Sequence, residues 1–226
     1  MRPQLRASVA LLALLPLWVG GERAAAQARP AQQVTSPILL WQPGVKLRWK
    51  DFEAVAPPPA DLSPDVRVAA CCVARIMVTP TATKKGQGTF LVASFLVKPY
   101  SWVRDSTTAQ NQLLLAHEQL HFDINELFAR KIRQRVAQYA QAGRYAFGPE
   151  LAREIRSLLD VKVAFNAAFD AQAHQDQGEG PIRHWQALVL QELDKLTRYQ
   201  STADMCDFSA IDWLEFSRAA PHVRVP

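Results

Sequence analysis

Residues 113–126 of this 226-residue chain read LLLAHEQLHFDINE, and this stretch decides which fold and which chemistry the sequence favours. His117 and His121 stand four positions apart, and Glu118 directly follows the first histidine. Positions four apart lie on one face of an α-helix, so both imidazoles can reach the same metal ion. Zinc accepts imidazole nitrogens at about 2.0–2.1 Å. The pattern therefore predicts a helix that presents two zinc ligands, His117 and His121.

Glu118 stands beside the first of these ligands, where a general base is needed. From there its carboxylate can take a proton from a zinc-bound water and pass it to a leaving amine. A chance HExxH is expected in about one chain in several hundred, and this one lies within a helical pattern. We therefore predict Zn2+ as the cofactor and Glu118 as the catalytic residue. The alternative is an amphipathic helix with two hydrogen-bonded histidines.

A catalytic zinc site of this kind uses three protein ligands and a water molecule. The metzincin subclass is excluded, because Ile124 and Leu127 stand where its glycine and third histidine would fall. A glutamate from the next helix is the gluzincin solution, and two histidines further along the chain are also available. The candidates for the third ligand are Glu150, Glu154, His174 and His184.

Other polar residues could assist the reaction. Asp123 could orient a ligand imidazole through its free N–H, or it could belong to a solvated helix face. The spacing of Glu126 and Arg130 instead predicts an ion pair along the helix. A group that stabilises an oxyanion is also expected. The candidates for that role are Tyr100, Tyr145 and His184.

The fold class predicted for the whole chain is α+β, with a small antiparallel sheet followed by a helical half. Residues 66–78 and 89–97 are apolar and flank the turn sequence at 83–88, which favours an antiparallel pair of strands. Residues 99–103 continue as extended chain or a third short strand. Apolar residues at helical spacing predict helices over about 106–142, 149–173 and 182–196. Ser106 or Thr107 would cap the first helix, and Gly143 would end it.

The beginning of the chain is typical of a signal peptide. Basic residues Arg2 and Arg6 precede an apolar run at 7–19, and small residues follow at 24–28. We expect residues 1–28 to be removed, 29–40 to form a loose leader, 41–200 to form one catalytic domain and 201–226 to form a tail. No later segment has the roughly 18 apolar residues of a membrane span, so the mature chain is expected in the periplasm or outside the cell.

Composition narrows the class of partner. The net charge is +5, of which residues 1–28 contribute +2, and no basic run is interleaved with aromatics. We therefore predict no nucleic-acid binding. Export would permit a disulfide from Cys206 to Cys71 or Cys72, and three free buried thiols are the alternative.

The run HEQLHFDINELFAR at 117–130 closely resembles the motif of a family of bacterial secreted proteins. That family was first catalogued as a domain of unknown function and is described as zinc-dependent proteases. The resemblance covers roughly residues 41–198. Three further elements are similar to the family: WKDF at 49–52, SWV at 101–103, and Phe169-Asp170 with His174 and Trp185, which looks like a Y-D-x-x-T-x-H-G segment followed by a tryptophan.

The resemblance implies a zincin-like domain and makes His174 the expected third ligand. The later segment departs from the family pattern, because Phe169 replaces the tyrosine, Ala173 replaces the threonine and His174 falls one residue early. We predict a secreted zinc metallopeptidase that hydrolyses a peptide or protein substrate. The alternatives are a zinc amidase acting on cell-wall peptides, and a non-catalytic periplasmic binding or assembly module with a vestigial metal site. Glu118 favours an enzyme, because a structural zinc site does not need that carboxylate.

Overall fold

The computed structural model describes residues 36–58, 69–82, 88–104, 111–144, 148–175 and 179–202. The predicted signal peptide, residues 29–35 of the leader, and the tail from residue 203, which contains Cys206, lie outside this part of the chain. No helix within the described ranges is long and apolar enough to cross a membrane.

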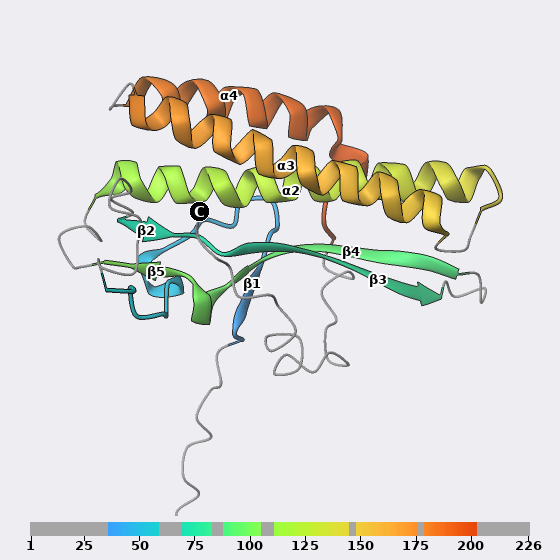
Figure 1. Cartoon of the computed structure of the whole chain (residues 1–226), viewed down its shortest axis with the longest axis horizontal. Helices are drawn as coiled ribbons and strands as arrows, with labels where there is room; N and C mark the ends of the chain where they lie inside the picture. Colours follow the sequence, from blue (N-terminus) through green and yellow to red (C-terminus); the bar gives the residue numbers. More distant parts are fainter. Residues whose placement is uncertain are drawn as a thin grey trace, which may run out of the picture. The chain divides into compact units, whose positions relative to one another are not determined.

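The strands form a small antiparallel sheet and a separate two-stranded ladder (Figure 1). The strands within the described residues are β1 (Ile38–Leu40), β2 (Ala70–Cys71), β3 (Ala74–Ala82), β4 (Gly88–Val97) and β5 (Trp102–Val103). The order in the sheet is β1-β4-β3, and β2 pairs with β5. The predicted antiparallel pair is confirmed as β3 and β4, with Val78 opposite Val92. Residues 38–40, which we expected in a loose leader, instead pair with β4 and belong to the domain.

The helical half contains three long helices, as the spacing of apolar residues predicted. The helical elements are α2 (Gln112–Gln141), α3 (Pro149–Gln175), α4 (Glu179–Lys195), and the short 3-10 turns η1 (Trp49–Asp51), η3 (Lys98–Tyr100) and η4 (Thr197–Tyr199). Ser106 and Thr107, the predicted caps, lie outside the described residues, and the cap of α2 in the structure is Asn111. Helix α2 begins later, because Asn111 Oδ1 accepts hydrogen bonds from the main-chain N–H groups of the first turn, at 3.0 and 3.1 Å. Gly143, with φ +74°, follows its last turn as expected.

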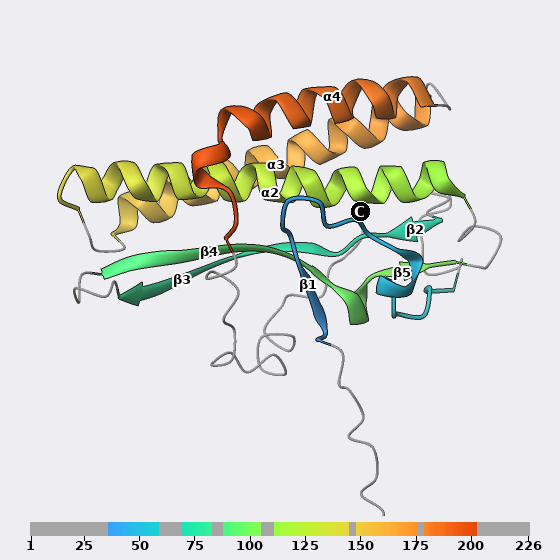
Figure 2. The same cartoon turned by 180° about the vertical axis from the view of Figure 1, so that it is seen from behind.

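Helix α2 is the central layer of an α+β domain. The sheet lies on one side of it and α3 and α4 lie on the other (Figures 1 and 2). On the sheet side, Ile132 of α2 packs in one cluster with Val92 of β4. On the opposite side, Phe128 of α2 packs with Phe169 of α3 and Val189 of α4. Because α2 is covered on both sides, polar residues in its middle must find partners inside the protein.

Glu126 is the centre of such a buried network, and its side chain is fully buried. Its Oε1 accepts hydrogen bonds from Arg130 Nε and Arg133 Nη1, both at 3.0 Å. Its Oε2 accepts from Ser201 Oγ at 2.9 Å. Arg130 in turn donates to the main-chain oxygen of Leu193 at 2.6 Å. The predicted pair of Glu126 and Arg130 is therefore confirmed, and it joins α2 to the end of α4 rather than lying on a solvated face.

Replacing Glu126 with Gln should lower the free energy of unfolding by about 3 kcal/mol, because two buried guanidinium groups lose their counter-charge. Urea denaturation would measure the change. Glu192→Gln is the matched control, since it removes a partly exposed partner of Lys195 and should change the stability by less than about 1 kcal/mol. Equal effects of the two substitutions would contradict the structural role of the buried network.

Candidate metal centre

The two histidines of the motif meet a carboxylate from α3. The Nε2 atoms of His117 and His121 lie 3.0 Å apart. Asp170 Oδ1 lies 3.2 Å from the first and 3.0 Å from the second. Neighbouring ligand atoms of a tetrahedral zinc ion with bonds of about 2.0–2.1 Å are about 3.3 Å apart. The three donor atoms therefore have spacings close to those of one face of such a tetrahedron. Among the described residues, His117, His121 and Asp170 are a group that could hold a metal ion.

Hydrogen bonding around His121 defines which atoms face this centre. Asn166 Nδ2 donates to the main-chain oxygen of Lys162 at 3.0 Å, so its Oδ1 is turned toward His121. The His121 Nδ1–H then donates to that oxygen at 2.7 Å. In a neutral ring, Nε2 is left with a lone pair directed at Asp170. Because lone pairs of this kind repel at 3.0 Å, the arrangement requires a proton or a cation between the rings and the carboxylate.

The pKa shifts of Asp170 and His121 also favour a bound cation. Burial alone would raise the pKa of Asp170, but hydrogen bonds from His117 and His121 hold it well below its usual range. Burial alone would lower the pKa of His121, but the hydrogen bond and charge of Asp170 raise it overall. The carboxylate is thus ionised beside the His121 ring, which favours positive charge. A divalent cation would satisfy all three groups at once.

Glu118 lies beside the cluster and is almost completely buried, with 3% of its surface exposed. Its Oε2 accepts a hydrogen bond from the main-chain N–H of Cys72 at 2.8 Å, which fixes the carboxylate against the end of β2. Burial raises the pKa of Glu118, and the charges of His121 and His117 act in the opposite direction. A carboxylate with a raised pKa is better suited to accept and return a proton near neutral pH.

Aromatic rings form the wall behind the histidines. The ring centroid of Phe169 lies 4.5 Å from that of His117 and 5.1 Å from that of His121. Trp185 of α4 packs on Phe169 at 5.7 Å, and its Nε1–H donates to Gln172 Oε1 at 2.7 Å. These contacts hold both imidazoles in place and exclude water from that side of the cluster.

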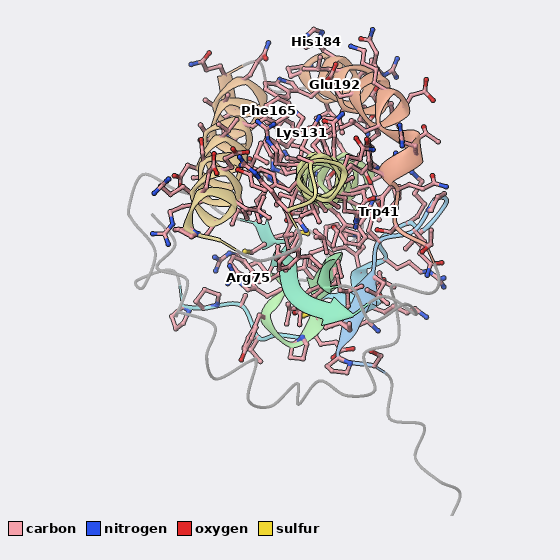
Figure 3. The ribbon with its side chains drawn as sticks, turned by 90° about the vertical axis from the view of Figure 1, so that its right-hand side faces the viewer. Trp41, Arg75, Lys131, Phe165, His184 and Glu192 are labelled. Carbon is pink, nitrogen blue, oxygen red and sulfur yellow. The ribbon has the colours of Figure 1, made fainter. Side chains whose placement is uncertain are left out.

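The expected third ligand, His174, is not part of the cluster. It is exposed, and its Nδ1 lies 2.6 Å from the main-chain oxygen of Asp170. The structure brings Asp170, one helical turn earlier, to the two histidines instead. The other candidates also lie elsewhere: Glu150 pairs with Arg144, Glu154 with Arg135, and His184 is exposed on α4 (Figure 3).

Of the residues considered for oxyanion stabilisation, Tyr100 is 42% exposed in η3 and Tyr145 lies outside the described residues. Asp123 also does not orient a ligand imidazole. Its Oδ1 accepts from Trp41 Nε1 at 2.8 Å and from Gln119 Nε2 at 3.0 Å. The residue that forms a hydrogen bond with Nδ1 of His121 is Asn166, which was not among the predicted site residues.

Replacing Asn166 with Ala should weaken zinc binding about 10- to 100-fold, because His121 would lose the partner that orients its ring and fixes its tautomer. A competition titration against a zinc chelator would measure the affinity. Asp123→Asn is the matched control, since the amide oxygen can still accept both hydrogen bonds while the charge is removed. If the Asp123 variant loses affinity and the Asn166 variant does not, the assignment of Asn166 is wrong.

The vicinal cysteines lie next to the Glu118 carboxylate, and neither forms a disulfide within the described residues. Burial raises the pKa of Cys71 to about 12, and the negative charge of Glu118 acts in the same direction. Burial likewise raises the pKa of Cys72 well above its usual value. The thiolate is the nucleophilic form of cysteine, so neither side chain is suited to act as a nucleophile. The predicted pairing with Cys206 lies outside the described residues.

Comparison with known proteins gives no further guide. We found no match to the chain among protein-family models, curated proteins or solved structures.

Proposed function

We propose that this protein is an exported zinc-dependent hydrolase, most simply a metallopeptidase, with a zincin-like site. His117, His121 and Asp170 would hold the metal ion, and Glu118 would be the general base. The observation that carries the proposal is the convergence of the two Nε2 atoms and Asp170 Oδ1 within 3.2 Å of one another, beside a buried carboxylate. Two nitrogens and one oxygen are a donor set that zinc accepts in catalytic sites.

A bound zinc ion would polarise the substrate carbonyl and acidify a water molecule. Glu118 would accept a proton from the attacking water and deliver it to the departing amine. The C–N bond breaks, a C–O bond forms, and the products are a carboxylic acid and an amine. The hydrogen bond from Cys72 N–H uses one carboxylate oxygen of Glu118, and the second oxygen would make these transfers.

The proposal is tested by metal content and by chelator-sensitive hydrolysis. We expect one zinc per chain by elemental analysis, cleavage of casein, loss of cleavage with a zinc chelator, and recovery when zinc is added. Purified peptidoglycan is the second substrate, because cleavage of its peptides without cleavage of casein would indicate a cell-wall amidase. Zinc binding without hydrolysis of either would favour a binding module, and absence of zinc binding would contradict the proposal.

A further inference from the structure

Polar residues on α2 and α3 extend beyond the metal centre as a ladder of contacts. The facing positions are His117 with Asp170, His121 with Asn166, and Asn125 with Lys162. On both helices successive members are four residues apart, and the helices run antiparallel, so each rung lies about 6 Å from the next. Two rungs belong to the candidate metal centre. The third rung, formed by Asn125 and Lys162, has no part in the chemistry proposed above.

Lys162 is held in a fixed position at this third rung. Its Nζ donates to Asn125 Oδ1 at 2.7 Å. Asn125 is fully buried, and its Nδ2 donates to the main-chain oxygen of Arg75 at 2.7 Å and to Ser94 Oγ at 2.9 Å. The amide therefore cannot turn away. An ammonium has three N–H donors, so Lys162 Nζ can bind up to two acceptors besides Asn125.

Arg75 supplies a second positive charge in the neighbourhood of Lys162. It lies in β3 beneath α3 (Figure 3), and its guanidinium is close enough to Lys162 to affect it electrostatically. Burial lowers the pKa of Lys162 to about 8, and the charge of Arg75 acts in the same direction. In the part of the chain that the structure describes, no carboxylate forms an ion pair with either side chain. Two half-buried like charges are unfavourable by themselves, and a bound anion would stabilise both.

We propose that Lys162 and Arg75 form a subsite for a substrate carboxylate beside the metal centre. The proposal rests on the proposed hydrolase function and names its substrate class, namely peptides with an acidic side chain or a free C-terminus near the cleaved bond. Ammonium and guanidinium groups both bind carboxylates through charge-assisted hydrogen bonds. Asn125 lies one turn of α2, about 6 Å, from His121, which is the length of about two residues of an extended peptide. The carboxylate would therefore stand about two residues from the scissile bond.

The test compares matched peptides on the zinc-loaded full chain. One series carries Glu or Gln at each position within three residues of a cleaved bond, and a second series has a free or an amidated C-terminus. We expect kcat/KM to be about tenfold higher for the peptide with the carboxylate. The ratio of kcat/KM between the two matched peptides should fall to about one in Lys162→Met and in the double variant Lys162→Met/Arg75→Gln. It should be retained in Lys162→Arg. The control is Lys195→Met, which alters an exposed lysine of α4 and should leave the ratio unchanged. A preference in the first series would indicate that the subsite binds a side-chain carboxylate, and a preference in the second would indicate that it binds the C-terminal carboxylate.

A binding measurement separates failure of the subsite from failure of the hydrolase. Calorimetry with glutarate and with its monoamide requires no cleavage. Tighter binding of glutarate by the parent, lost in the double variant, would support the subsite even if no peptide is hydrolysed. Zinc-dependent hydrolysis with no preference for a carboxylate, or with a preference that the double variant keeps, would overturn the subsite and leave the hydrolase in place.

Discussion

Replacing Glu118 with Gln is expected to lower kcat/KM for hydrolysis by about three to four orders of magnitude while one zinc ion stays bound. The amide cannot accept a proton from water, and general acid–base catalysis contributes up to about 10⁴-fold. The metal ligands are unchanged, and the amide oxygen can still accept the hydrogen bond from Cys72 N–H, so the fold should be kept. Chelator-sensitive hydrolysis and the zinc content of the same sample measure both quantities.

Glu150→Gln is the matched control for this experiment. Glu150 is an exposed residue at the start of α3 that pairs with Arg144, and its substitution should leave both hydrolysis and zinc content unchanged. A Glu118 variant that cleaves as fast as the parent would rule out the proposed mechanism. A variant that loses zinc as well as activity would instead assign Glu118 to the metal site.

Replacing Asp170 with Ala is expected to weaken zinc binding about a thousandfold, because the donor group found among the described residues would lose its carboxylate and keep two imidazoles. The side chain of Asp170 is 41% exposed, so its removal leaves little buried space. A chelator competition titration gives the zinc affinity, and thermal unfolding of the zinc-free protein checks that the fold is intact.

His174→Ala is the control that decides between the two candidates for the third ligand. Its ring is exposed and contacts the main-chain oxygen of Asp170, so its removal should leave zinc affinity unchanged. The opposite pattern, in which the His174 variant loses zinc and the Asp170 variant keeps it, would mean that the zinc-bound protein uses the ligand that the family resemblance implies.

Local features of this fold could be predicted from the sequence because they depend on short-range periodicity. The apolar runs on either side of residues 83–88 predicted the pairing of β3 and β4, and the apolar spacing after residue 149 predicted α3. The four-residue spacing of His117 and His121 likewise predicted their proximity, which the structure has at 3.0 Å between the Nε2 atoms. Each of these depends on residues within one strand pair or one helix.

The partner of the histidine pair could not be predicted in this way, because it depends on how α3 docks against α2. Lys162, Asn166, Asp170 and His174 follow one another at four-residue spacing, so they share a face, and spacing alone cannot tell which of them stands opposite the two histidines. The antiparallel register decides, since Asp170 lies opposite His117 and His174 falls one turn beyond it. Aligning the polar residues at four-residue spacing on α2 with those on α3 in antiparallel order would have suggested Asn166 and Asp170 as the partners of the histidines.

The role expected for Asp123 could have been rejected from the sequence. Two residues turn an α-helix by about 200°, so Asp123 and His121 point to opposite sides of α2. The structure has this arrangement, with Asp123 bound to Trp41 and the histidines facing α3. Residues one helical turn apart share a face, and residues two apart do not.

The most direct test of the central claim is the position of zinc in crystals of the zinc-loaded protein, measured by anomalous scattering at the zinc edge. We predict one peak bonded to the Nε2 atoms of His117 and His121 and to a carboxylate oxygen of Asp170. A peak at any other group of residues, or none at full zinc loading, would contradict the proposed metal site.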